Sequence, residues 1–336
     1  MNAPVLAPPR QAKDYATDQE VRWCPGCGDY AILKAVLKTL ADLEADPAKT
    51  VFVSGIGCAA RFPYYVETYG FHTIHGRAPA VATGVKLANP ELDVWVVGGD
   101  GDLLSIGGNH LIHALRRNLD LQILLFNNEI YGLTKGQASP TSRRGTRSPS
   151  TPQGSLDAPL SALKLALGAG ARFVARGIDT QQKVLPEILK RARRHRGAAL
   201  VEILQNCIVY NDEAFAHITA KAAEAEAQIH VSHGEPLLFG KDRAKGLRLR
   251  RDGFGLEVAP AGAEGILRHD ETNPQLAALL AALEPPLPVA IGILLDHPAP
   301  AYDDEVRALE AHETAQARTR SLNDLLRQGA TWAAGG

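Results

Sequence analysis

The segment Gly98–Thr134 constrains the fold of this chain more than any other. It reads GGDGDLLSIGGNHLIHALRRNLDLQILLFNNEIYGLT. An apolar run over Val94–Val97 leads into it, an amphipathic stretch covers Leu103–Asn118, and a second apolar run, Leu121–Phe126, ends in two asparagines. This order predicts a strand, a glycine turn, a helix, a strand and a polar turn. Both turns then lie at the carboxyl ends of neighbouring parallel strands, where open α/β sheets bind ligands.

The two turns carry the groups that a diphosphate and a divalent metal ion need. Glycines let backbone N–H groups approach the phosphates, and the start of the following helix favours anions. Asp100 and Asn128 supply oxygen atoms, and Mg²⁺ is usually held by one or two such groups together with phosphates and water. A Gly-Asp-Gly triplet followed after 25 residues by the asparagine pair resembles the thiamine diphosphate signature. An ordinary turn would explain the triplet alone, but not the second turn at this distance.

Composition and charge restrict the remaining possibilities. A chain of 336 residues with 45% hydrophobic residues can hold one large α/β domain and an appendage. The net charge of −1 provides no general attraction for nucleic acid or membranes. No apolar run is as long as a bilayer span, and residues 1–20 lack the apolar core of a signal peptide. We therefore expect a cytoplasmic protein with a flexible N-terminal arm, binding neither nucleic acid nor membranes.

The chain has four cysteines, which in a chain without an export signal indicate metal or redox use. Cys24 and Cys27 form a Cys-x-x-Cys motif that alone is compatible with a zinc knuckle, a thioredoxin-like dithiol or unrelated thiols. Cys58 and Cys207 each follow a predicted strand, so all four cysteines fall in predicted loops. Four thiolates are the usual ligands of one [4Fe–4S] cluster, and zinc would accept the same set. A redox partner for thiamine chemistry favours the iron–sulfur cluster.

The other predicted elements continue the alternation of strands and helices. Helices are expected over Tyr30–Leu43, Pro79–Leu87, Leu160–Leu167 and Gln181–His195, and strands over Val51–Ser54, Arg172–Ala175 and Ala198–Gln205. We interpret residues 21–210 as one α/β domain with a doubly wound parallel sheet. Residues 211–336 form an expected irregular C-terminal extension. It contains a surface helix (Glu213–Gln228), a hairpin (Glu235–Gly240 with Leu247–Leu256), helices over Asn273–Leu283 and Asp303–Arg327, and a strand over Val289–Leu295.

Two polar features allow more than one interpretation. His75 precedes a Gly-Arg pair ahead of a predicted helix, where it either caps the helix or lies on the diphosphate or near the thiazolium ring. The segment Ala138–Ser155 is a polar loop rich in Ser, Thr, Pro and Arg. Its Arg143, Arg144 and Arg147 are typical of a solvated loop, with an anion site as the alternative.

Seven motifs together resemble the β subunit of 2-oxoacid:ferredoxin oxidoreductases, most closely the 2-oxoglutarate type. They are WCPGCGDY, GIGCAARFPYY, TIHGRAP, ATGVKLANP, GGDGDLLSIGGNH, NNEIYGLTKGQASPTS and HGEPLLFG. The resemblance implies a pyrophosphate-type domain with thiamine diphosphate, Mg²⁺ and one [4Fe–4S] cluster, in an α₂β₂ assembly whose α subunit completes the active site. The implied reaction converts 2-oxoglutarate, CoA and oxidised ferredoxin into succinyl-CoA, CO₂ and reduced ferredoxin.

Family roles carry over where the motifs match. The implied cluster ligands are Cys24, Cys27, Cys58 and Cys207. The implied Mg²⁺ ligands are Asp100, Asn128 and the backbone carbonyl of Ile130. The implied contacts of thiamine diphosphate are Ile56, Gly57, Cys58, Ala59, His75, Gly99, Asp100, Gly101, Asp102, Asn128, Gly132 and Leu133. Arg61 and Lys135 fall where the family reads the distal group of the oxoacid, and with His75 they are the candidate catalytic residues. Ala59 stands where the family often has Ser, which puts a hydroxyl contact there in doubt.

Other classes of protein remain open at this point. Within the family, pyruvate, branched-chain or broad-range oxoacids are alternative substrates. A thiamine decarboxylase or synthase without electron transfer would not need four loop cysteines. A non-catalytic iron–sulfur or zinc scaffold would not need the Gly-Asp-Gly and Asn-Asn turns.

Overall fold

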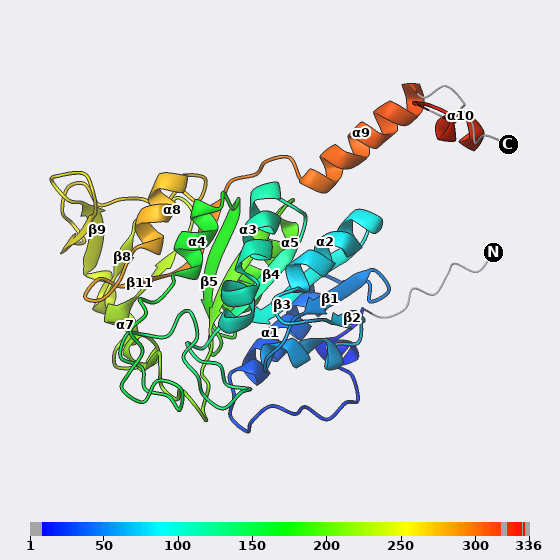
Figure 1. Ribbon diagram of the computed structural model, residues 1–336. Helices are drawn as coiled ribbons and strands as arrows, with labels where there is room; N and C mark the ends of the chain where they lie inside the picture. Colours follow the sequence, from blue (N-terminus) through cyan, green and yellow to red (C-terminus); the bar gives the residue numbers. More distant parts are fainter. Residues whose placement is uncertain (1–8, 317–320, 331, 333–336) are drawn as a thin grey trace, which may run out of the picture.

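An eight-stranded sheet forms the centre of the computed structural model, which describes residues 9–316, 321–330 and 332 (Figure 1). Its strands lie in the order β2 (Tyr69–His72), β1 (Thr50–Ser54), β3 (Asp93–Gly99), β4 (Gln122–Asn127), β6 (Ala199–Leu204), β5 (Phe173–Ile178), β11 (Val289–Asp296) and β7 (Gln228–Val231). Adjacent strands from β2 to β5 pair in parallel. The predicted α/β fold with a parallel sheet is thus confirmed, and strand β11 is antiparallel to β5.

Helices cover both faces of this sheet. Their bounds are α1 Asp29–Asp42, α2 Ala78–Ala88, α3 Gly108–Arg117, α4 Ala162–Gly168, α5 Leu185–Arg194 and α8 Pro274–Ala281. Helices α1 and α5 pack on one face, in the same apolar cluster as Phe52 and Trp95. Helices α2, α3, α4 and α8 share the opposite cluster with Val51 and Val53. Successive residues of β1 therefore point to opposite faces, and both faces are buried, which explains the continuous apolar runs in the sequence.

The helix predicted over Leu103–Asn118 is interrupted. A π-helical turn, η3 (Asp102–Ile106), comes first, and Ser105 within it has non-helical angles of φ −89° and ψ −107°. Helix α3 then starts at Gly108. Such a turn is common at functional sites, and here it follows directly on the Gly-Asp-Gly triplet.

The part of the chain after residue 210 differs most from its prediction. The helix predicted over Glu213–Gln228 is wrong: two short helices, α6 (Ala216–Thr219) and α7 (Glu224–Ala227), replace it. Ala220 is extended between them (φ −62°, ψ 134°) and redirects the chain toward β7. Tertiary pairing outweighs the local helix propensity of this Ala- and Glu-rich segment.

A three-stranded antiparallel sheet takes the place of the predicted two-stranded hairpin. Strands β8 (Leu238–Phe239) and β9 (Lys245–Leu249) do pair antiparallel, but the chain then turns and adds β10 (Leu256–Pro260), so a three-stranded sheet results. The second half of the predicted strand Leu247–Leu256 is instead a turn, closed by a bond from Arg250 N to Gly255 O (2.8 Å), and β10 begins at its last residue.

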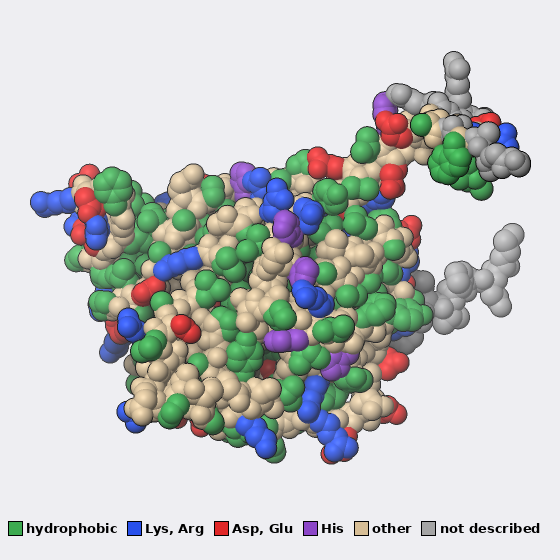
Figure 2. All heavy atoms as spheres, in the orientation of Figure 1, with side chains coloured by type: hydrophobic (Ala, Val, Ile, Leu, Met, Phe, Trp, Pro, Cys, Tyr) green, Lys and Arg blue, Asp and Glu red, His purple; other side chains and the backbone are tan. Residues whose placement is uncertain are grey.

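The two ends of the described chain differ in how they pack against the domain. Residues 1–8 of the expected flexible arm lie outside the described residues, but η1 (Ala12–Tyr15) packs on the domain, because Tyr15 is fully buried and donates to Ala45 O (2.7 Å). Helix α9 (Tyr302–Gln316) projects from the body, with acidic side chains along it (Figures 1 and 2). Beyond it lies α10 (Leu322–Leu326). Among the described helices, none has the length and apolar character that a bilayer span requires.

The division predicted at residue 210 stays a prediction, but the sheet itself runs across that point. Strands β11 and β7 both come from the expected extension, and in the main sheet β11 pairs with β5 and β7 pairs with β11. The segment after residue 210 therefore contributes to the core that supports the site described below.

Candidate active site

Loops after four strands meet at one edge of the sheet. Strands β1, β3, β4 and β6 are parallel, so the segments 55–59, 99–102, 127–133 and 205–207 all follow carboxyl ends on the same side. The N-terminal start of α1 joins them, since Gly28 N donates to Asn206 O (3.1 Å). This is the edge at which parallel sheets bind ligands.

The residues predicted to contact thiamine diphosphate line one cavity of about 190 Å³, called the cofactor cavity here. Its lining includes Ile56, Gly57, Cys58, Ala59, His75, Gly99, Asp100, Gly101, Asp102, Asn128, Ile130, Gly132 and Leu133. The structure therefore brings the whole predicted set together, from four separate segments of the chain.

Asp100 is the buried carboxylate of this cavity. Its Oδ2 accepts hydrogen bonds from Ser139 Oγ and Thr141 Oγ1, both at 2.5 Å. Burial raises the pKa of Asp100 to about 6, although the two hydroxyls oppose this shift. Asn128 lies nearby in the lining, with its Oδ1 accepting from Ile130 N (3.1 Å). These groups offer one carboxylate and neutral oxygens, the donor set that suits Mg²⁺ with phosphates and water.

Asp102 connects the loop after β1 to the loop after β2 through hydrogen bonds. Its Oδ1 accepts from Ile56 N (3.0 Å) and Gly76 N (2.7 Å), and it lies 2.7 Å from His75 Nδ1. His75 therefore does not cap α2, whose N-cap is Arg77. A Cβ on Gly55 would lie 2.0 Å from Asp102 Oδ2, so only glycine fits there.

The four cysteines line a second cavity of about 180 Å³, called the cysteine cavity here. All four are free thiols and lie outside helices and strands, as predicted. Burial raises the pKa of the Cys27 thiol far above its usual range and that of Cys58 to about 11, and negative charge from Asp29 and Cys207 adds to both shifts. Burial therefore keeps these two thiols protonated at neutral pH, and a bound metal would favour their thiolate forms.

The two cavities share a wall. Asp29, Cys58, Asn128, Gly132 and Leu133 line both of them, together with Gln205. Within the described residues, no three His, Cys, Asp or Glu side chains converge closely enough to hold one metal ion.

The predicted cations lie outside the cofactor cavity. Arg61 lines the cysteine cavity, and its Nη1 donates to Arg22 O (2.5 Å). Lys135 is exposed on a left-handed turn (φ 76°) and is absent from the lining of both cavities. In the polar loop, Arg143 pairs with Glu129 (3.0 Å).

Sequence reasoning missed several residues that build the site. Asp29 is 1% exposed, and burial raises its pKa to about 7, although a hydrogen bond with Cys27 opposes this shift. Gln205 donates to Cys27 Sγ (3.3 Å), and Tyr131 donates to Gly101 O (3.1 Å). Ser139 and Thr141 hold Asp100 from the polar loop. The one available signal was their position in the NNEIYGLTKGQASPTS segment, which does not tell which carboxylate they bind.

A parallel sheet that places a Gly-Asp-Gly turn beside an Asn-Asn turn is typical of thiamine diphosphate enzymes. Residues 55–203 match the family described as "Thiamine pyrophosphate enzyme, C-terminal TPP binding domain". Over 338 residues the chain is 51% identical to the 2-oxoglutarate oxidoreductase subunit KorB of Mycobacterium tuberculosis, covering 98% of this chain and 90% of that one. The chain therefore belongs to the family of 2-oxoacid:ferredoxin oxidoreductase β subunits.

Further relatives agree with this placement. The β subunit of 2-oxoacid:ferredoxin oxidoreductase 1 of Aeropyrum pernix is 51% identical over 203 residues, or 60% of this chain and 64% of that one. The fold is similar to the 2-oxoglutarate:ferredoxin oxidoreductase of Magnetococcus marinus, solved with 2-oxoglutarate, coenzyme A and succinyl-CoA bound. That match has a TM-score of 0.76 and 33% identity and covers 94% of each chain.

Proposed function

We propose that this chain is the β subunit of a thiamine diphosphate-dependent 2-oxoglutarate:ferredoxin oxidoreductase. The complete enzyme would convert 2-oxoglutarate and CoA into succinyl-CoA and CO₂ and reduce ferredoxin. The observation that carries the proposal is the wall shared by the cofactor cavity and the cysteine cavity, because decarboxylation and electron removal need neighbouring sites. A thiamine enzyme without electron transfer would have no use for four thiols beside its cofactor. A cytoplasmic location is part of the same proposal.

Asp100, Asn128 and the Ile130 carbonyl would hold Mg²⁺ at the diphosphate end of the cofactor cavity. Support comes from the donor set and from the burial of the Asp100 carboxylate, which raises its pKa and which a nearby cation would oppose. When bound, thiamine diphosphate supplies a nucleophilic carbon and an electron sink for decarboxylation. The glycines at 99 and 101 would let the backbone approach the phosphates, and His75, held by Asp102, would face the cofactor from the opposite loop.

Cys24, Cys27, Cys58 and Cys207 would ligate one [4Fe–4S] cluster. Their common cavity and their free thiols support this assignment, and four thiolates are the usual ligand set. When bound, the cluster supplies a one-electron acceptor. Cys58 lies in the lining of both cavities, so a single short loop would separate the cluster from the decarboxylation site.

The chain alone is expected to be inactive. Its motifs serve the diphosphate end of the cofactor, and the carboxylate that engages the aminopyrimidine would come from an α subunit, in an α₂β₂ assembly. Ile56 and Leu133 in the cofactor-cavity lining are 38% and 44% exposed, as expected for a site that a partner covers. The test compares CoA-dependent dye reduction by the reconstituted chain with and without co-expressed α subunit. Full activity of the chain alone would contradict the proposal.

Substrate preference is expected to depend on Arg61. A 2-oxoglutarate enzyme must hold a second carboxylate, and a guanidinium favours it over the methyl group of pyruvate. In the α-subunit complex, Arg61→Ala should raise the KM for 2-oxoglutarate far more than that for pyruvate. Lys135→Ala tests the second predicted cation in the same assay, and Arg144→Ala in the polar loop is the matched control. Equal effects of Arg61→Ala on both oxoacids would indicate a structural role, through its bond to Arg22 O.

A further inference from the structure

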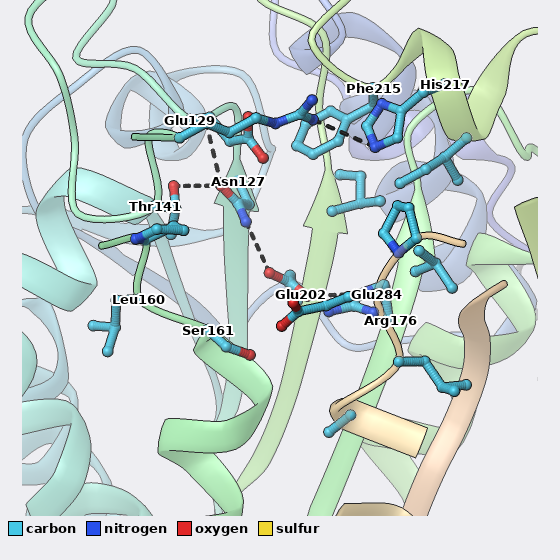
Figure 3. A pocket seen from close by; sticks show the side chains of 18 residues that line it. Asn127, Glu129, Thr141, Leu160, Ser161, Arg176, Glu202, Phe215, His217 and Glu284 are labelled. Carbon is cyan, nitrogen blue, oxygen red and sulfur yellow. Dashed lines mark hydrogen bonds and ion pairs between the residues drawn. The ribbon is translucent and has the colours of Figure 1, made fainter. Parts of the chain in front are cut away.

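A continuous chain of polar contacts joins the cofactor cavity to a third cavity of about 370 Å³ (Figure 3). Thr141 Oγ1 lies 2.5 Å from Asp100 Oδ2 and 2.8 Å from Asn127 Oδ1. Asn127 Nδ2 donates to Glu202 Oε1 (2.8 Å), and Arg176 Nε donates to Glu202 Oε2 (2.7 Å). In Figure 3 the labelled side chains of Thr141, Asn127, Glu202 and Arg176 follow one another along this line.

The far end of this chain is fixed by the sheet. Arg176 and Glu202 are register partners on β5 and β6, and the Glu202 side chain is 3% exposed. Asn127 ends β4 beside them and is 6% exposed. A buried ion pair that loses a partner leaves a costly unpaired charge, so its geometry is held tightly. The amide of Asn127 therefore has one favourable orientation, with nitrogen toward Glu202 and oxygen toward Thr141.

We propose that Thr141 is a positioning residue for Asp100. This inference rests on the proposed function, in which Asp100 is a ligand of Mg²⁺. The hydroxyl of Thr141 and that of Ser139 both contact Oδ2 of the carboxylate and so hold its orientation. Thr141 itself is 4% exposed, and Asn127 Oδ1, 2.8 Å from its Oγ1, is the second possible acceptor of its proton. The loop that carries both hydroxyls is fixed as well, because Ser142 Oγ donates to Glu129 O (2.5 Å).

The hydroxyl of Thr141 carries one proton and faces two acceptors. A bound Mg²⁺ keeps Asp100 ionised, and a hydrogen bond to a charged acceptor is stronger than one to a neutral amide. The proton then belongs to the bond with Asp100, and this bond would hold the carboxylate in the orientation described above. Loss of such an outer partner typically weakens metal affinity by about 10- to 100-fold.

The test uses the complex with the α subunit, freed of Mg²⁺ by dialysis against EDTA. Mg²⁺ is titrated into it by calorimetry at saturating thiamine diphosphate. Thr141→Val keeps the shape and removes the hydroxyl, so its Mg²⁺ affinity should fall by about 10- to 100-fold. Thr141→Ser should restore most of that affinity, which a purely steric role would not produce. Ser139→Ala, which removes the other hydroxyl, should lower the affinity in the same direction.

Thr146→Val is the matched control, because this threonine lies in the same loop but bonds to Arg143 O (2.7 Å). Its Mg²⁺ affinity should equal that of the wild type. Thermal unfolding without metal checks that each variant is folded, and Ser139→Ala carries the test if Thr141→Val is not. An unchanged Mg²⁺ affinity in the folded variants, or a loss that Ser does not recover, would overturn the inference. Wild-type complex that binds thiamine diphosphate without Mg²⁺ would overturn the proposed metal site as well.

Discussion

Replacing Asp100 with alanine is expected to abolish Mg²⁺-dependent binding of thiamine diphosphate. Asp100 is the one acidic group among the three proposed metal ligands, and the remaining amide and carbonyl oxygens are neutral. The loss should exceed the roughly 100-fold upper range for outer-shell partners, because a direct ligand is removed. Calorimetry on the α-subunit complex, with thiamine diphosphate titrated at saturating Mg²⁺, measures it.

Two further variants separate charge from shape at this position. Asp100→Asn keeps the volume and removes the charge, so it should lose most of the affinity too. Glu91→Ala removes an exposed carboxylate that pairs with Lys49 (3.4 Å) before the start of β3, at the opposite end of that strand from Asp100, and should bind like the wild type. Unchanged affinity in Asp100→Ala would refute the assignment of this carboxylate to the metal.

Removing one cysteine should remove or destabilise the cluster. Protein purified without oxygen should contain about four irons per chain, the content of a Cys₄-ligated [4Fe–4S] centre. Cys24→Ser and Cys207→Ser each replace a soft thiolate with a hydroxyl that does not ionise at neutral pH, so iron content and visible absorption should fall sharply. Cys24 and Cys207 come from opposite ends of the domain sequence, so parallel losses would support one shared site.

Val209→Ser provides the control for these cysteine variants. It introduces a hydroxyl two residues from Cys207 in the lining of the cysteine cavity without removing a thiol. Its iron content should match that of the wild type. Stoichiometric zinc with no iron in the wild-type protein would contradict the iron–sulfur assignment, since zinc accepts the same ligands.

The centre of the fold could be predicted from the sequence because local chemistry defines it. The apolar runs of β3 and β4 are buried on both faces, and glycines or asparagines end each run. The segment Gly98–Thr134 and the apolar run before it therefore predict both strands, both turns and the position of the two turns beside each other. The predicted contact residues of the cofactor line one cavity because most of them lie in loops that follow a predicted strand.

The features that escaped prediction depend on contacts between distant segments. The hydroxyl of Thr141 meets a carboxylate 41 residues earlier, and no local pattern specifies that pairing. The segment Glu213–Gln228 has the composition of a helix, but its last residue must start β7 beside β11. Lys135 matched a family position, yet its side chain is exposed on a turn whose direction the motif does not reveal.

The place of β11 in the sheet has a consequence for how the chain folds during synthesis. Strand β5 ends at Ile178, but the neighbour that covers its open edge begins at Val289, about 110 residues later. Until the ribosome has released that segment, the backbone N–H and C=O groups along this edge of β5 can pair with other chains. Long-range strand pairing of this kind slows folding and prolongs exposure to aggregation. Recombinant production should therefore gain from slow translation and available chaperones, and a product shortened before residue 289 should be recovered mainly in the insoluble fraction.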